Sequence, residues 1–600
     1  MKKIELKINH IIKDELQAIN NLNYYLENYL LSFGIAKKDL DSFIHAPRIT
    51  DEDDPMNLLN MNLAVSIAER ECTKPNAKVF VQVDSDCDGY TSAAIVINYL
   101  KRRYPGLSIE YRLHSGKEHG VVVETVPENT TLVIIPDAGS NQNEEVQALI
   151  DRGCAVIILD HHEINGDIMN FPNVALVNNQ VSSAFNNKYM SGAGVTYMFC
   201  KAIDLKYGDF ISHDYRDLAA IGIIADAMNM TSLGNNFLAY HGLRNIKNKF
   251  IKEIAIKQAR AISNPDKLTK MNVAWYIAPV INGVIRSGSI EDKETVFRAM
   301  TENDCCEHFA HEWRGEVKQE TLYQLAARLA VNAKSRQDSN KKKSFEWLCE
   351  TIENNNWQKD NLIIVPLTSD QTSKVSANVT GLIAMELVKH YNRPCLVLRE
   401  TEYEGQSMYG GSGRNGKFYA LPSLLDFLRD SNLTEYVAGH ANAHGCFIKE
   451  ENIQPLRDLA NSTIDARAFD DTVFEVDYWF KTNEVIDRNM LMQFAENDSL
   501  YGNSIPAPLF AFDFNIKAEE MKVLGAKQST VKFSHEGVDF ITFEGADLIQ
   551  QIHEKGSGHL QIIGRPQINE FNGWRNLQVN IEDVSFSEWV NVPSTLLDLI

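Results

Sequence analysis

Three features that would each point to a familiar class of protein are missing from this sequence. Its 600 residues contain no apolar run long enough to cross a bilayer, and its nine cysteines include no CxxC pair. Positive charge is also scarce, because 59 Lys and Arg against 80 Asp and Glu give a net charge of −21. We therefore expect no membrane protein, no zinc site or disulfide framework, and no overall basic surface for duplex nucleic acid.

The composition is otherwise that of an ordinary globular protein, with 44% hydrophobic and 23% charged residues. The length predicts several domains. The amino-terminal stretch MKKIELKINHIIKDEL carries charges throughout and lacks the apolar core of a signal peptide, so a cytoplasmic location is expected. Cys305 and Cys306 are expected to be buried apolar fillers.

An apolar stretch that runs into three carboxylates is the most informative part of the chain. Residues 78–83 are rich in Val and Phe and predict a buried strand, and the apolar spacing in 91–104 predicts a helix. Asp84, Asp86 and Asp88 lie in the turn between them. Ligands of open α/β sheets bind beyond the carboxyl ends of strands, which is where these carboxylates fall.

The same pattern occurs twice more, since residues 131–136 and 154–159 also predict buried strands of a doubly wound parallel sheet. The polar residues that follow these strands are Asp137, Asp160, His161 and His162. Any one aspartate after a strand is most simply a turn residue. Three strands that deliver carboxylate or imidazole to the same sheet edge instead favour a site for manganese or magnesium.

In order and spacing, these motifs resemble the DHH phosphoesterase superfamily, named for the triplet Asp160, His161 and His162, and within it the RecJ single-strand exonucleases. The similar segments are VDSDCDGYTSAA from Val83, PDAGS from Pro136, LDHHE from Leu159, SGAGVTYMF from Ser191, AAIGIIADAMNMT from Ala219 and INGVIRSGS from Ile281. The resemblance implies two Mn²⁺ or Mg²⁺ ions, with metal ligands Asp84, Asp86, Asp88, Asp137, His161 and Asp226. It also implies that His162 contacts the scissile phosphate or orients the water, and that Asp160 holds an imidazole in place.

Two positions depart from the superfamily pattern. Many members carry a ligand histidine where this chain has Gln82, so we expect Asp84 to supply the missing ligand. RecJ relatives tend to carry an arginine for the terminal phosphate where this chain has Ser115. Lys117 is the residue that we expect to compensate, as a point charge rather than a bidentate fork.

A second α/β unit is predicted from strands at 362–366 and 395–398 and a helix at 376–391. Its segments GGSGRNG, from Gly410, and AGHANAHG, from Ala438, resemble the phosphate-handling motifs of the DHH-associated domain. The resemblance implies phosphate binding by Arg286, Ser412, Arg414 and His440. The alternative for the first segment is a glycine-rich surface turn with an exposed arginine.

The last part of the chain changes to short alternating strands, and Asn572-Gly573 is a strong hairpin signal. By resemblance we expect an OB-like β-barrel in which Phe571 and Trp574 either stack on bases or simply pack. The expected organisation is two α/β domains joined by a long helix, followed by this barrel. The expected bounds are 1–75 for a helical lead-in, 76–303 for the DHH domain, 304–360 for the connecting helix and linker, 361–470 for the DHH-associated domain and 471–600 for the barrel.

The first hypothesis for function is a metal-dependent exonuclease that degrades single-stranded DNA from the five-prime end in repair, recombination or replication. A helicase or a single-strand-binding protein would be its expected partner, and no membrane is involved. One alternative keeps the chemistry but acts on short RNA or cyclic dinucleotides. Another is a catalytically decayed replication scaffold, which would have no need for intact carboxylates.

Overall fold

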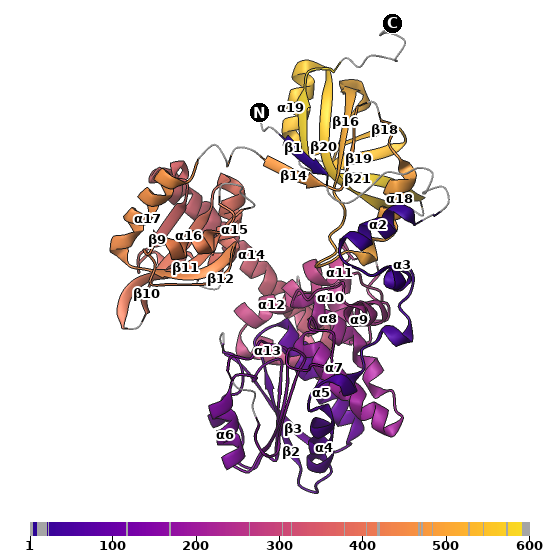
Figure 1. Cartoon of the computed structure of the whole chain (residues 1–600), viewed down its shortest axis with the longest axis vertical. Helices are drawn as coiled ribbons and strands as arrows, with labels where there is room; N and C mark the ends of the chain where they lie inside the picture. Colours follow the sequence, from indigo (N-terminus) through magenta and orange to yellow (C-terminus); the bar gives the residue numbers. More distant parts are fainter. Residues whose placement is uncertain are drawn as a thin grey trace. The chain divides into compact units, whose positions relative to one another are not determined.

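The computed structural model (Figure 1) describes residues 4–8, 21, 23–115, 118–166, 170–262, 264–302, 304–313, 315–376, 379–403, 405–416, 421–465, 469, 472–482, 484–525, 528–543, 545–571 and 574–590. The chain divides into two compact units. One unit comprises Met1–Lys7 and Ser335–Glu475, and the other comprises Ile8–Lys334 and Val476–Ile600. None of the helices within the described residues combines the length and the apolar composition that crossing a membrane requires.

A five-stranded parallel sheet with the order β3-β2-β4-β5-β6 forms the centre of the larger unit. Its strands are β2 (Lys78–Val83), β3 (Ser108–Leu113), β4 (Leu132–Pro136), β5 (Ala155–Asp160) and β6 (Val174–Asn178). The strand order reverses beside β2, which is the topological switch point of a doubly wound sheet. The predicted fold class is confirmed.

Helices cover both faces of this sheet (Figure 1). One face packs against α4 (Met61–Cys72), α5 (Cys87–Arg103) and α7 (Gly192–Tyr207), and the other against α6 (Asn143–Asp151). α8 (Arg216–Ala225) packs in turn on α5 and α7. Alternate residues of β2 enter the two cores, with Val81 on one side and Phe80 on the other. Burial on both faces explains why the strands are nearly continuous apolar runs.

The rest of this part of the chain is largely helical. Its helices are α9 (Leu233–Leu243), α10 (Lys249–Lys257), α11 (Lys270–Asn272), α12 (Ala278–Ser287) and α13 (Ile290–Thr301). A hairpin of β7 (His308–Trp313) and β8 (Glu316–Thr321) follows, and then the long helix α14 (Leu322–Asn354). The expected burial is wrong for Cys306, because its side chain is exposed just before this hairpin, and Cys305 is only half-buried.

The smaller unit contains a mixed sheet with the order β12-β13-β11-β10-β9. Its strands are β9 (Ile363–Leu367), β10 (Cys395–Tyr403), β11 (Gln406–Arg414), β12 (Tyr436–His440) and β13 (Ala443–Ile448), and its helices α15 (Thr380–Tyr391), α16 (Leu424–Asp430) and α17 (Glu450–Thr463). The glycine-rich segment that starts at Gly410 therefore forms strand β11 rather than a surface turn. A short pair of β1 (Ile4–Ile8) and β14 (Thr472–Val476) completes the strands described for this part.

The carboxyl-terminal part forms a seven-stranded sheet with the order β15-β16-β20-β21-β19-β18-β17. Its elements are β15 (Tyr478–Phe480), α18 (Arg488–Ala495), β16 (Phe510–Lys517), β17 (Lys522–Leu524), β18 (Thr530–His535), β19 (Val538–Thr542), α19 (Ala546–Lys555), β20 (Ser557–Phe571) and β21 (Trp574–Ser587). β20 and β21 pair as far as Phe571 and Trp574. The expected turn residues, Asn572 and Gly573, and the Phe571 side chain lie outside the described residues.

This sheet shares one hydrophobic core with helices from the beginning of the chain. α2 (Tyr24–Ser32) and α3 (Leu40–Ile44) pack against the same buried side chains as α18, β16 and β20. Tyr29, for example, is fully buried and stacks edge-on against Phe494 at a centroid distance of 5.4 Å. Residues 24–44 of the expected lead-in thus belong to the core of the carboxyl-terminal domain. α4, which also falls within 1–75, packs on the parallel sheet instead.

Candidate metal centre

The local backbone fixes the positions of Asp86, in the turn after β2, and of Asp137, which follows β4. Asp86 is the N-cap of α5, and its Oδ1 accepts a hydrogen bond from the Gly89 amide at 3.0 Å. Gly89 cannot carry a side chain, because a Cβ there would lie 2.8 Å from the Asp84 carbonyl oxygen. Asp137 follows β4 with a φ of +63°, in the left-handed region that aspartate tolerates better than most residues.

The structure brings seven of the candidate site residues into one cluster at the carboxyl edge of the parallel sheet. Three groups, each with ligand atoms within 4.8 Å of one another, could hold a cation. The groups are Asp84, Asp86 and Asp137; Asp88, His161 and Asp226; and Asp137, His161 and His162. Because Asp137 and His161 each belong to two groups, the three form one connected set of ligands.

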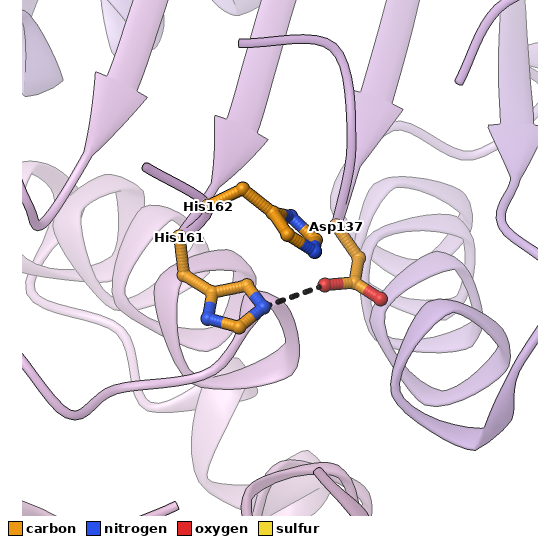
Figure 2. A group of neighbouring side chains, drawn as sticks. All are labelled: Asp137, His161 and His162. Atoms are coloured by element: carbon orange, nitrogen blue, oxygen red, sulfur yellow. Dashed lines mark ion pairs between the residues drawn. The ribbon is translucent and has the colours of Figure 1, made fainter. Parts of the chain in front are cut away.

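His161 and Asp137 face each other at the centre of this set (Figure 2). His161 Nε2 lies 3.3 Å from Asp137 Oδ1 and 3.5 Å from Asp226 Oδ2. Burial and the neighbouring His162 charge lower the pKa of His161 to about 4, so its ring is neutral and able to bind a metal. Asp137 Oδ1 is buried and accepts no hydrogen bond from any described residue. An orphaned carboxylate oxygen beside a neutral imidazole fits a divalent cation.

Asp88 is held by the beginning of α7. Its carboxylate accepts hydrogen bonds from Ser191 Oγ at 2.9 Å and from the Gly192 and Ala193 amides at 2.8 and 3.1 Å. Burial and the charges of Asp226 and Asp86 nevertheless raise the pKa of Asp88. The carboxylates therefore repel one another in a buried place, and a bound cation would relieve that repulsion.

Asp160 lies behind the cluster and orients His162. Its Oδ1 is 2.8 Å from His162 Nδ1, and its Oδ2 accepts the Ser140 amide at 3.0 Å. Burial alone would raise the pKa of Asp160, but the His162 and Ser140 hydrogen bonds hold it below its usual range. The same hydrogen bond outweighs burial at His162 and raises its pKa to about 9. The half-exposed His162 ring is thus fixed in orientation at the rim of the site.

Asp84 has a partner that sequence reasoning missed. Its Oδ2 lies 2.9 Å from His119 Nδ1, and its Oδ1 accepts the Gly120 amide at 3.2 Å. Nothing in the sequence signals this contact, because His119 belongs to no recognised motif. Gln82, which stands where many superfamily members have a ligand histidine, is buried and directs its amide to His114 Nε2 at 3.1 Å.

The candidate phosphate-binding residues are divided between the two units. Arg286 is exposed in the last turn of α12 in the larger unit. Ser115 is also exposed, and Lys117, two residues further on, lies outside the described residues. In the smaller unit, Ser412 and Arg414 lie on β11 and His440 on β12.

Arg414 has the surroundings of an anion-binding residue. It makes no ion pair with any described residue, and burial lowers its pKa. Its guanidinium passes over the start of α15, where a Cβ on Gly381 would lie only 2.4 Å from Nη2. A partly buried guanidinium at a helix N-terminus, with no carboxylate partner, is suited to a phosphate group.

Comparisons with known proteins agree with this architecture. Residues 78–223 match the DHH family N-terminal domain, and residues 482–583 match the RecJ OB domain. A protein of Bacillus subtilis strain 168 named as a prophage-derived single-strand DNA-specific exonuclease, YorK, is 32% identical over 536 residues, covering 88% of this chain and 90% of that protein. The single-stranded-DNA-specific exonuclease RecJ of the same organism is 25% identical over 567 residues, covering 91% of this chain and 66% of that protein.

Among solved structures, RecJ from Thermus thermophilus in complex with Mn²⁺ superimposes with a TM-score of 0.68 at 20% identity, covering 98% of this chain and 80% of that chain. At this identity the likeness shows a shared fold. The 32% sequence identity to YorK over nearly the whole length also shows membership of the same family. The chain belongs to the DHH phosphoesterase family, in its RecJ-like branch.

Proposed function

We propose that this chain is a metal-dependent exonuclease that hydrolyses single-stranded DNA from the five-prime end. The observation that carries the proposal is the connected set of carboxylate and imidazole ligands around the orphaned Asp137 Oδ1. Relatives named as single-strand DNA-specific exonucleases support the substrate. Two solved structures of RecJ from Thermus thermophilus, the one with Mn²⁺ described above and a second in complex with Mg²⁺, support the choice of metal.

The ligand set would hold two Mn²⁺ or Mg²⁺ ions through Asp84, Asp86, Asp88, Asp137, His161 and Asp226. When bound, such ions supply an activated water and stabilise the attacking and leaving oxygens at phosphorus. The protein's own contribution begins with His161, which is neutral and faces Asp137 and Asp226. Because no nucleophilic side chain is needed, we assign none.

His162 would contact the scissile phosphate. Its pKa of about 9 keeps the ring protonated at neutral pH, so its Nδ1–H donates to Asp160 while the other nitrogen can donate to a phosphate oxygen. Arg414, in the smaller unit, would bind a phosphate through the bidentate geometry that only arginine offers. A chain with a net charge of −21 needs such local cations to hold a polyanion.

A panel of substrates tests the proposal. The full chain with Mn²⁺ is incubated with single-stranded DNA labelled at either end, matched RNA, duplex DNA and a cyclic dinucleotide, with Asp226→Asn as the background control. We expect mononucleotides to be released from the five-prime end of single-stranded DNA only. Preferential cleavage of RNA or of the cyclic dinucleotide, or release from the three-prime end, would overturn the proposed specificity.

The proposed substrate also suggests a class of partner protein and a location in the cell. Single-stranded DNA is produced by unwinding and is covered by binding proteins, so a helicase or a single-strand-binding protein is the partner class that we propose. We propose the cytoplasm as the location for the same reason.

A further inference from the structure

A basic surface lies at the far ends of two helices that reach the metal centre. α5 begins beside Asp86 and ends near Lys101, and α8 begins at Arg216 and ends beside Asp226. With a rise of 1.5 Å per residue, the far ends lie roughly 15–25 Å from the candidate ligands along these helices. This surface is therefore distinct from the metal centre and plays no part in the proposed chemistry.

Two adjacent hollows form the basic surface, with volumes of about 370 and 570 Å³. They share a wall made of Asp214, Asp217 and Lys247. The cationic residues that line the two hollows are Lys101, Arg102, Arg216, Arg244, Lys247 and Lys249. Hollows of this size accept short segments of a ligand rather than a flat partner surface.

Part of this positive charge is not neutralised within the protein. Arg102 pairs with Asp214 at 2.5 Å, and Arg216 with Glu52 at 3.3 Å. Lys249 pairs at 3.4 Å with Asp304, a third carboxylate, which lines the second hollow. The exposed side chains of Lys101, Arg244 and Lys247, by contrast, make no ion pair with any residue that the structure describes. In a chain with a net charge of −21, three such cations around two hollows produce a local field that attracts anions.

An exposed aromatic ring borders the first hollow. Phe210 is 72% exposed, and its ring centroid lies 5.2 Å from that of His213, which lines the hollow. A large apolar side chain left in water beside a cationic hollow offers an apolar contact next to the charged ones. The ligand should therefore combine negative charge with at least one apolar group.

The carboxylates of the shared wall favour an acidic peptide over a nucleic acid strand as the ligand. Asp217 is buried and accepts hydrogen bonds from the Leu218, Lys247 and Asn248 amides, and Asp214 stands beside it. A nucleic acid strand carries a phosphate on every nucleotide, so a strand crossing both hollows would press one against these carboxylates. A peptide can place acidic side chains in the hollows and uncharged residues at the wall.

We propose that this basic surface binds an acidic peptide segment of a partner protein, with carboxylates in the two hollows and an apolar side chain against Phe210. The proposal does not depend on the nuclease assignment, since neither the ligands nor the substrate enter it. Rim charges of this kind mainly speed association and make binding sensitive to salt.

Fluorescence anisotropy with a labelled probe peptide, Asp-Asp-Gly-Gly-Asp-Asp-Phe, tests the proposal on the full chain. We expect saturable binding at low salt that weakens by about tenfold or more in the double variant Lys101→Glu/Lys247→Glu. Phe210→Ala should weaken binding by roughly threefold. The matched control is Lys257→Glu, which reverses an exposed charge at the other end of α10 from Lys249 and should leave binding unchanged.

Two further measurements decide the result. All variants should melt like the parent and retain metal-dependent cleavage of short single-stranded DNA within about twofold. A twelve-residue oligothymidylate should bind the parent and the double variant equally. The proposal is overturned if the peptide does not bind, if the double variant binds it as tightly as the parent, or if the double variant loses oligothymidylate binding instead.

Discussion

Asp137 is the most constrained residue of the metal centre, because it combines a left-handed backbone, full burial and an oxygen without a hydrogen bond. Asparagine tolerates the same backbone conformation and has nearly the same shape. Asp137→Asn should therefore preserve the fold while it removes one negative charge from the ligand set. We expect Mn²⁺-dependent cleavage to fall by more than about 100-fold, since even outer-shell partners of metal ligands cost roughly 10–100-fold.

Cleavage rates beside thermal melting curves, with and without Mn²⁺, measure this effect. The metal-free variant should melt at or above the temperature of the parent, because one member of a mutually repelling cluster has been neutralised. The added stability from Mn²⁺ should shrink. Cleavage at the parental rate in saturating Mn²⁺ would show that Asp137 is not a ligand.

The pKa values of the cluster predict how metal binding depends on pH. Burial and neighbouring carboxylates raise the pKa of Asp88 from 3.8 to about 7 and that of Asp226 from 3.8 to about 6. A raised folded-state pKa means that these groups contribute stability below pH 4 that is lost as pH rises through 6 to 7. A metal must displace the same protons, so its affinity should rise over that window.

Calorimetric titration with Mn²⁺ between pH 5 and 8 measures the affinity, and melting curves without metal measure the stability. We expect tighter binding and a lower metal-free melting temperature as pH rises. The Asp226→Asn variant serves as control and should show a weaker dependence in both. A melting temperature that rose through this window would contradict the assignment of the raised pKa values to this cluster.

At the scale of elements, three of the five strands of the parallel sheet, β2, β4 and β5, could be predicted closely from sequence, whereas β3 and β6 were not predicted. The expected strand at 78–83 coincides with β2, because a strand buried on both faces must be continuously apolar. Strand β11 could not be predicted, since Gly410, Gly411 and Gly413 resemble a turn. A Cβ on Gly411 would lie 2.1 Å from the Val397 carbonyl oxygen, so these glycines permit close contact between neighbouring strands.

The candidate site shows the same division. Residues that directly follow strands were within reach of sequence reasoning, because the carboxyl ends of parallel strands share one edge. His119 and the hydrogen bonds from the start of α7 to Asp88 depend on contacts between segments far apart in sequence. No local pattern encodes such contacts. The roles of the ligands themselves stay predictions.

The hairpin of β20 and β21 permits a test of the carboxyl-terminal domain as a grip on DNA. Trp574 is 76% exposed at the beginning of β21 and has no role in the core. If the domain stacks bases on it, Trp574→Ala should weaken binding to long single-stranded DNA by roughly 1–3 kcal/mol. Melting temperature and cleavage of very short oligonucleotides should stay unchanged.

Filter binding with a thirty-residue single strand measures this loss. Phe210→Ala removes a similarly exposed aromatic ring just beyond the end of α7 and should have no effect on this binding. If Trp574→Ala bound the strand with the affinity of the parent, Trp574 would not contact DNA, and any DNA-binding surface of the domain would lie elsewhere.

At the scale of the whole molecule, the shared core decides how the chain can be divided. Tyr25, Leu26, Tyr29 and Leu30 of α2 are no more than 1% exposed, and carboxyl-terminal side chains cover them. Deleting residues from 476 onward would expose them, at roughly 1.5–3 kcal/mol for each large apolar side chain. We expect that deletion to aggregate, whereas a chain of residues 45–475 should remain dispersed.

Light scattering and melting curves of the two deletions compare them directly. If the chain of residues 1–475 stays dispersed with an unchanged melting temperature, the helices at the beginning of the chain are stable without the carboxyl-terminal sheet. Removing residues 1–44 as well would then bring no advantage, and the first helices and the carboxyl-terminal sheet would not share a core.

The shared core also determines when the first helices can fold during synthesis of the chain. Phe43 and Phe586 belong to the same cluster, although about 540 residues separate them along the chain. At a synthesis rate of about 5–20 residues per second, the apolar face of α2 and α3 waits roughly half a minute to two minutes for its partner sheet. During that interval the parallel sheet can fold, while the first helices of the nascent chain are a natural binding site for chaperones.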